Sequence, residues 1–182
     1  MNLTPEEKAA RARDRMIATA NKYQVGTYSS RFVAPLFQRM IRAEAAAEAS
    51  GYTSAATKNC GALGISNVWR YRGECVCVTC GKIGPWSGGL GGMHTGHFLA
   101  SRRHSILFEE DNVAPQCSYC NRYRGGAPQE FRLWMEHVRG AETIARLEQL
   151  KTTVRHFSRE ELVDMRIAYQ LRLDEAVELM RL

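Results

Sequence analysis

With 182 residues, 45% of them hydrophobic, the chain is long enough for one ordinary domain core or for a small core with helical appendages, and we favour the second. Its net charge of +6, in which Arg outnumbers Lys by 20 to 5, favours an anionic partner, although a solvated surface explains the charge equally well. No run approaches the roughly 20 apolar residues that span a bilayer, and the N-terminus has no apolar signal core, so we expect a cytoplasmic protein without a membrane partner.

Two helices are expected in the first third of the chain. Thr4 and Glu7 have capping-box spacing around Pro5, which predicts a helix that runs into the low twenties. The stretch 26–30 indicates a break, after which apolar residues recur at helical spacing and end near Ser50. The residues that follow, up to 73, are rich in Thr, Ser, Asn and Gly, which is typical of a linker or an extended arm.

Three helices are expected after the middle of the chain. One is opened by Pro128 and closed by Gly140, and a shorter one extends to about Lys151. A second capping box, Ser158 with Glu161, starts the longest helix. The apolar stripe of that helix packs either inside the same subunit, which is the usual outcome, or along the seam of a possible homodimer. The stripe consists of Leu162, Met165, Tyr169, Leu173, Ala176, Val177 and Met180.

The segment between these helices is rich in glycine and poor in bulky apolar residues, so it cannot bury enough surface to hold itself together. It contains two Cys-x-x-Cys pairs, formed by Cys77, Cys80, Cys117 and Cys120. One pair alone would fit a redox motif, but two pairs have the spacing of a four-thiolate Zn2+ site, which is structural because no coordination position stays open. Cys75 is an alternative to Cys77 with an unusual spacing, and Cys60 has no assigned role.

Two histidines, His94 and His97, lie between the cysteine pairs in a stretch too glycine-rich for a helix. A nuclease needs a group that takes a proton from water and a hard divalent cation that stabilises charge on the phosphate, and an imidazole can do the first. The alternative is that one histidine is a further zinc ligand or a satisfied structural residue. Considered without the flanking motifs, the two histidines favour that alternative.

The motifs together resemble treble-clef HNH nucleases, also called His-Me fingers, and more closely the phage NinG/Rap recombination nucleases. The shared features are Cys-x-x-Cys-Gly at 77–81, Gly-His-Phe at 96–98, Gln-Cys-x-x-Cys-Asn at 116–121, Phe131-Arg132 in a helix, and the capped helix from Ser158. The wider phage endonuclease VII group shows the same order of zinc pairs and histidines. The resemblance implies a DNA endonuclease that acts on branched or nicked recombination intermediates such as Holliday junctions and D-loops, in the bacterial host cytoplasm if the protein is phage-encoded.

The roles of that family fall on particular residues by resemblance. His97 corresponds to the general base, Asn112 to the residue that braces the loop carrying the base, and Asn121 to a ligand of the catalytic Mg2+ or Mn2+. At Gly96 the sequence departs from the pattern, because many HNH enzymes have a metal-binding Asp there. We hypothesise that His94 replaces this ligand, although imidazole is a softer donor for Mg2+ than carboxylate is.

Basic residues near these positions are candidates for contacts with DNA phosphates. They are Arg102, Arg103, His104, Arg122 and Arg124. Arg132 either reaches the DNA backbone or braces the active site. Trp86 either covers the zinc knuckle or stacks on an unpaired base.

The expected fold is α+β and mostly helical, with a small zinc-stapled ββα nuclease core between N- and C-terminal helices. We divide the chain into an N-terminal helical region with linker (1–73), the zinc-bound core (74–126) and a C-terminal helical region (127–182). Two other functions stay open. One is a sequence-directed nicking or homing-type HNH endonuclease, and the other is a zinc-stabilised DNA-binding module whose nuclease site has decayed.

Overall fold

The computed structural model describes residues 4–47, 51–53, 68–70, 73–89, 91–100 and 104–181. Most of these residues are helical, and the strands form small two-stranded antiparallel sheets, which agrees with the α+β class expected from the sequence. Within the described ranges, no helix is both long and apolar enough to cross a membrane.

The first helix, α1 (Pro5–Ala20), begins where the capping box predicts. The backbone N–H of Glu7 donates to Thr4 Oγ1 at 3.2 Å, and the N–H of Thr4 donates to Glu7 Oε2 at 2.8 Å. Each side chain thus bonds an amide that the helix leaves without an internal acceptor, and the prediction is confirmed.

The break expected at 26–30 is wrong. The chain turns at 21–24 and is helical again in α2 (Val25–Tyr28), a π-helical segment η1 (Ser29–Val33) and α3 (Ala34–Ala47). Tyr28 and Val33 are fully buried. Burial of these side chains in the core outweighs the low helix propensity of the Gly, Thr and Ser residues around them.

The strands pair as three antiparallel ribbons. Strand β1 (Gly51–Thr53) pairs with β2 (Val68–Arg70), and β3 (Glu74–Val76) pairs with β4 (Ile83–Pro85). Five of the six residues of the β1–β2 pair lie in the segment 52–73 that the sequence predicted to be a linker or an extended arm, so part of that segment forms a ribbon. Cys60 lies outside the described residues.

The third ribbon positions the predicted site. Strand β5 (Met93–His97) pairs with β6 (Val113–Cys117), with His94 opposite Gln116 and His97 opposite Val113. The π-helical segment η4 (Tyr119–Tyr123) directly follows β6. This is the order of elements in a ββα motif, and the assignment to the His-Me finger fold stays a prediction.

Three later helices follow the sequence prediction closely, namely α6 (Pro128–Val138), α7 (Gly140–Thr152) and α8 (Arg159–Arg181). The short helix α5 (His104–Leu107) and the 3-10 turn η3 (Glu110–Asn112), which precede them, were not predicted. The second capping box is present, since the N–H of Glu161 donates to Ser158 Oγ at 3.1 Å and the N–H of Ser158 donates to Glu161 Oε2 at 2.7 Å.

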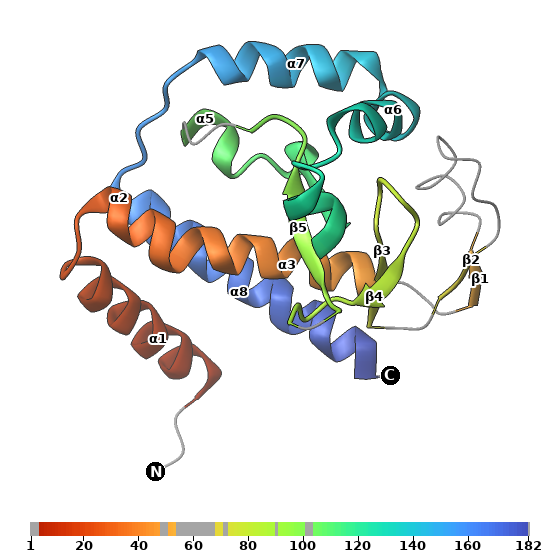
Figure 1. The fold of residues 1–182 in the computed structure, drawn as a ribbon. Helices are drawn as coiled ribbons and strands as arrows, with labels where there is room; N and C mark the ends of the chain where they lie inside the picture. The colour runs from red at the N-terminus through yellow and green to blue at the C-terminus, as the bar shows by residue number, and fades with distance from the viewer. Residues whose placement is uncertain are drawn as a thin grey trace.

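Helices α3 and α8 lie side by side across the molecule, with α1 beside one end of the pair and β5 on the side facing α6 and α7 (Figure 1). The apolar stripe of α8 packs in one cluster with Phe37 and Met40 of α3, so packing within the subunit is confirmed for this stripe. Val113 of β6 belongs to the same cluster. This core therefore contains residues from all three predicted regions, 1–73, 74–126 and 127–182. The division of the chain into these regions stays a prediction.

One side chain joins α3, α8 and η3. The guanidinium of Arg172 donates to both carboxylate oxygens of Glu44, at 2.7 and 2.9 Å, and to those of Glu110, at 2.5 and 2.9 Å. Such paired, charge-assisted contacts are geometrically specific. Arg172 therefore fixes the far end of the chain against the helix that precedes the strands.

Candidate functional site

The four cysteines of the two Cys-x-x-Cys pairs converge on one point. Their sulfur atoms all lie within 4.8 Å of one another, and three of the four residues are buried. Cys77 and Cys80 lie in the turn after β3, which is closed by hydrogen bonds of 2.8 Å from Cys77 N to Lys82 O and from Gly81 N to Cys77 O. Cys117 ends β6 and Cys120 lies in η4. This geometry fits a closed tetrahedral Zn2+ site.

Two of the four thiols are weak acids in the metal-free protein. Burial raises the pKa of the Cys80 thiol and of the Cys120 thiol, so neither would ionise readily in the metal-free protein. A divalent cation compensates the charge of clustered thiolates, and the site would then be structural because all four ligands come from the protein.

Buried polar side chains support the cysteine cluster. Thr79 Oγ1 lies 3.2 Å from Cys77 Sγ, and Gln116 Nε2 donates to Thr79 Oγ1 at 3.3 Å and to Gly126 O at 2.8 Å. Both Thr79 and Gln116 are fully buried. Cys75 is not part of the cluster, since its Sγ donates to the backbone oxygen of Arg42 at 3.2 Å. Cys77, not Cys75, is therefore the ligand in this arrangement.

Trp86 is half-buried and packs against the core that contains the cysteine cluster. Its backbone oxygen accepts a hydrogen bond from Arg42 Nε at 2.9 Å. The position agrees with the interpretation in which Trp86 covers the zinc knuckle.

His97 ends β5 and is partly buried. Burial lowers the pKa of its imidazole, which keeps the ring neutral and able to accept a proton at neutral pH. The loop after it is held by the fully buried Asn112, whose Oδ1 accepts from Leu99 N at 2.8 Å and whose Nδ2 donates to Leu99 O at 3.2 Å. These contacts are of the kind that the predicted bracing role requires, and the catalytic roles themselves stay predictions.

A cleft of about 520 Å³ opens beside β5. It brings together His94 and Asn121, the two side chains predicted to bind the catalytic cation, with Arg122. The other residues that line it are Gln38, Arg42, Ser87, Gly88, Gly89, Met93 and Thr95. Burial, and then the charges of Arg122 and Arg42, lower the pKa of His94, so its imidazole is neutral at neutral pH.

His97 is not among the residues that line this cleft. Met93, His94 and Thr95 of β5 line the cleft, and the described lining does not extend to His97 at the end of the strand. His97 stands opposite Val113, a residue of the core between α3 and α8. The structure therefore joins His94 with Asn121 and does not place His97 in the same cleft.

The cleft has an unusual set of donors for a Mg2+ site. Among the described residues, its lining contains two amide side chains, those of Gln38 and Asn121, and one imidazole, that of His94, but no carboxylate. It also contains two guanidinium groups, those of Arg42 and Arg122. Mg2+ prefers hard oxygen ligands and is repelled by neighbouring cations. The side chains of the cleft alone do not make a complete Mg2+ site.

The residues predicted to contact DNA differ in their surroundings. Arg122 lines the cleft. Arg124 forms an ion pair with Glu130. Arg102 and Arg103 lie outside the described residues, and of His104 only the backbone position, at the start of α5, is described.

Arg132 is held on the outer surface of α6. It forms an ion pair of 2.7 Å with Glu148 of α7, and its guanidinium lies 5.7 Å from the centre of the Phe98 ring. Phe98 follows His97, so this stacking supports the bracing interpretation of Arg132 more than the DNA-contact interpretation.

Two features near the cleft were not expected from the sequence. Arg42 and Gln38 reach it from α3, where they read as polar positions of an amphipathic helix. Tyr119 and Tyr123 of η4 are 62% and 81% exposed, and their rings stack with centroids 6.3 Å apart. In the sequence, the signal for this stacked pair is that the two tyrosines are four residues apart and lie on either side of Asn121.

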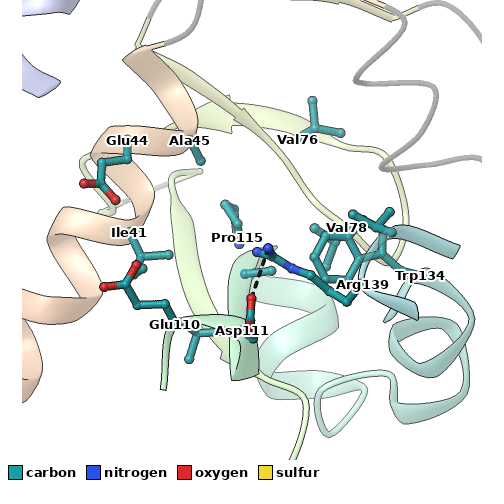
Figure 2. Close-up of a pocket in the computed structure, with 13 residues that line it drawn as sticks. Ile41, Glu44, Ala45, Val76, Val78, Glu110, Asp111, Pro115, Trp134 and Arg139 are labelled. Carbon is teal, nitrogen blue, oxygen red and sulfur yellow. Dashed lines mark ion pairs between the residues drawn. The ribbon is translucent and has the colours of Figure 1, made fainter. Parts of the chain in front are cut away.

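A second cavity, of about 400 Å³, lies between α3, β6 and α6 (Figure 2). Its charged groups are paired: Asp111 with Arg139 at 3.2 Å, and Glu44 and Glu110 with Arg172. None of the site residues predicted from the sequence lines it. We assign the cavity no part in the chemistry.

Comparison with known proteins gives one informative result. Neither the curated proteins nor the solved structures contain a significant match. The family model described as bacteriophage lambda NinG protein matches residues 41–178, which include the cysteine cluster, all the cleft residues named above except Gln38, and most of α8. This match covers more than half of the chain, and the family is associated with phage recombination. The chain therefore belongs to the NinG family.

Proposed function

We propose that this protein is a DNA endonuclease that hydrolyses phosphodiester bonds in branched recombination intermediates such as four-way junctions and D-loops. The observation that carries the proposal is the position of the cleft. Asn121 and Arg122 directly follow the last cysteine of the cluster, so the four thiols hold them opposite His94 on β5. Membership in a phage recombination family supports the choice of branched DNA.

His97 is our candidate for the general base. Its lowered pKa keeps the imidazole neutral, and the loop that follows it is fixed by Asn112. The imidazole takes a proton from water, the water oxygen bonds to phosphorus, and the bond from phosphorus to the 3′ oxygen breaks, which leaves a 5′ phosphate. Because His94 shares the cleft with Asn121 and His97 does not, His94 is the competing candidate for the base.

A requirement for Mg2+ or Mn2+ follows from the family resemblance and belongs to the proposal. When bound, such a cation would supply charge stabilisation at the phosphate and at the leaving oxygen. Asn121 and His94 are the side chains that would hold it, with the missing oxygen ligands coming from water and from the DNA.

The test is cleavage of a labelled four-way junction and of linear duplexes of fixed and random sequence, with Mg2+, with Mn2+ and with EDTA. We expect metal-dependent cutting of the junction, loss of cutting in His97→Ala, and unchanged zinc content and junction binding in that variant. If His97→Ala cuts normally while His94→Ala does not, the base is His94.

Other outcomes identify the two alternatives. Cutting at one site in the linear duplex indicates a sequence-directed nicking enzyme. Binding of the junction without cutting, under all metal conditions, indicates a zinc-stabilised binding module. The absence of a carboxylate among the described residues of the cleft would explain that outcome. Either result contradicts the proposed function.

A further inference from the structure

We infer that Arg42 makes the cleft an anion site that binds a DNA phosphate group before any divalent cation. The inference rests on the proposed function for the identity of the ligand, and it adds a residue from α3 to the site. The shared chemistry is that of a phosphodiester or a free phosphate ion.

Arg42 is a buried charge that is fixed in place. Its side chain is only 8% exposed, its Nε donates to Trp86 O at 2.9 Å, and its Nη1 donates to Thr95 Oγ1 at 2.8 Å. The Thr95 hydroxyl in turn donates to Gln38 O at 2.8 Å. These bonds orient the planar guanidinium of Arg42 toward the cleft, which Gln38, Arg42 and Thr95 all line.

The charge of Arg42 has no carboxylate partner within the described part of the chain. None of the ion pairs there involves Arg42, and the bonded oxygens, those of Trp86 and Thr95, are neutral. Nη2 has no acceptor among the described residues. A guanidinium stays protonated even when burial lowers its pKa, so a buried one without a counter-charge is stabilised strongly by an anion.

The rest of the cleft suits the same ligand. Arg122 supplies a second guanidinium from η4. Gly88 and Gly89, with φ of +82° and +79°, pass along the wall without a side chain. A phosphate between the two arginines would receive charge-assisted hydrogen bonds from both. Without it, the two positive groups would repel a divalent cation, so the anion must come first.

The first experiment uses inorganic phosphate and no DNA or divalent cation. The 15N-labelled protein, with its zinc in place, is titrated with phosphate at constant ionic strength while the Arg42 Nε–H resonance is followed. The hydrogen bond to Trp86 should slow exchange of that proton enough to observe it. We expect a saturable shift, and the absence of any shift would overturn the inference without any variant being made.

The second experiment measures phosphate affinity by calorimetry in Arg42→Gln, Arg42→Lys and the control Arg39→Gln. Arg39 is exposed, lies one turn before Arg42 and carries the same charge. We expect Arg42→Gln to lose about tenfold or more in affinity, Arg42→Lys to lose less, and Arg39→Gln to match the natural protein. Circular dichroism and zinc content establish that each variant is folded, and if Arg42→Gln does not fold, the Arg42→Lys comparison decides. Equal affinity in folded Arg42→Gln would overturn the inference.

The result separates this inference from the proposed function. Junction binding in EDTA should weaken in Arg42→Gln and not in Arg39→Gln. If the natural protein cuts junctions but phosphate binding does not depend on Arg42, the inference is wrong and the function stands. If phosphate binding depends on Arg42 but no DNA is cut, the anion site stands and the function is wrong.

Discussion

Gln116 occupies the space that a side chain on Gly96 would need. An ideal Cβ at position 96 would lie 2.6 Å from Cδ and 2.9 Å from Cγ of Gln116, and nearer still to its Oε1. Gln116 cannot move freely, because its amide nitrogen is bonded to Thr79 and to Gly126. Position 96 is therefore a glycine because it packs against the residue that supports the cysteine cluster, which explains why no acidic residue stands there.

The first prediction is that Gly96→Ala destabilises the protein by about 1–3 kcal/mol, through overpacking against Gln116. Denaturant unfolding in the presence of zinc measures this. The double variant Gly96→Ala/Gln116→Ala should lose less unfolding free energy than the two single variants lose together, because the clash between the two side chains is removed. Gly26→Ala is the control, since nothing lies within 4 Å of a Cβ there. Additive losses at 96 and 116 would show that the two positions do not compete for space.

The second prediction concerns zinc. We expect one zinc per chain by atomic absorption, and a large fall in Tm on removal of the metal with a strong chelator, because the cysteine cluster joins the β3–β4 turn to β6 and η4. Cys120→Ser should behave like the chelated protein. Cys75→Ser, which leaves the four ligands intact, should keep its zinc. A protein that contains no zinc and is insensitive to chelation would contradict the assignment.

The third prediction is the pH dependence of cleavage. Burial lowers the pKa of His97, our proposed base, below its usual 6.5, so its imidazole is mainly neutral at pH 6.5 and above. As the pH falls through the lowered pKa, His97 becomes protonated and kcat/KM for junction cleavage should fall. The acidic limb should therefore lie below pH 6.5 in a profile from pH 5 to 8. A limb centred above pH 7 would show that another group limits the rate.

The fourth prediction uses salt to separate two arginines. Arg122 lines the cleft, whereas Arg132 is paired with Glu148 and stacked on Phe98. Arg122→Ala should reduce the slope of log K against log salt for junction binding by about one, as expected for one lost phosphate contact. Arg132→Ala should leave that slope unchanged. The reverse result would place the DNA along α6 and not in the cleft.

The fifth prediction concerns acid stability. The hydrogen bonds from Arg172 hold the pKa of Glu110 below its usual 4.5. A carboxylate with a lowered folded pKa contributes stability above pH 4.5, and that contribution is lost as the pH falls through the folded value. Both side chains are more than one third exposed, so we expect about 1 kcal/mol or less at neutral pH. Glu110→Gln should show a shallower loss of unfolding free energy between pH 5 and 3.

Local signals in the sequence were sufficient for the starts of α1, α6 and α8 and for the cysteine cluster. The capping boxes at Thr4 and Ser158 depend on residues three positions apart, and the cysteine pairs carry their own spacing. Tertiary effects were not accessible in this way. Helix η1 forms because Val33 is buried, and Arg42 enters the cleft only because α3 packs against β5. Which face of β5 each histidine occupies depends on a register that the glycine-rich sequence does not reveal.

Arg42 and Glu44 are two residues apart on α3, and they link the cleft to the last helix of the described chain. Arg42 lines the cleft, and Glu44 binds Arg172 of α8, which follows every cleft residue in the sequence. A newly synthesised chain could close its cysteine cluster once η4 has left the ribosome, but α3 could take its final place only after α8 has emerged. The cleft would then be completed only after α8 has emerged, so a product truncated before α8 would retain the cysteine cluster without a finished cleft.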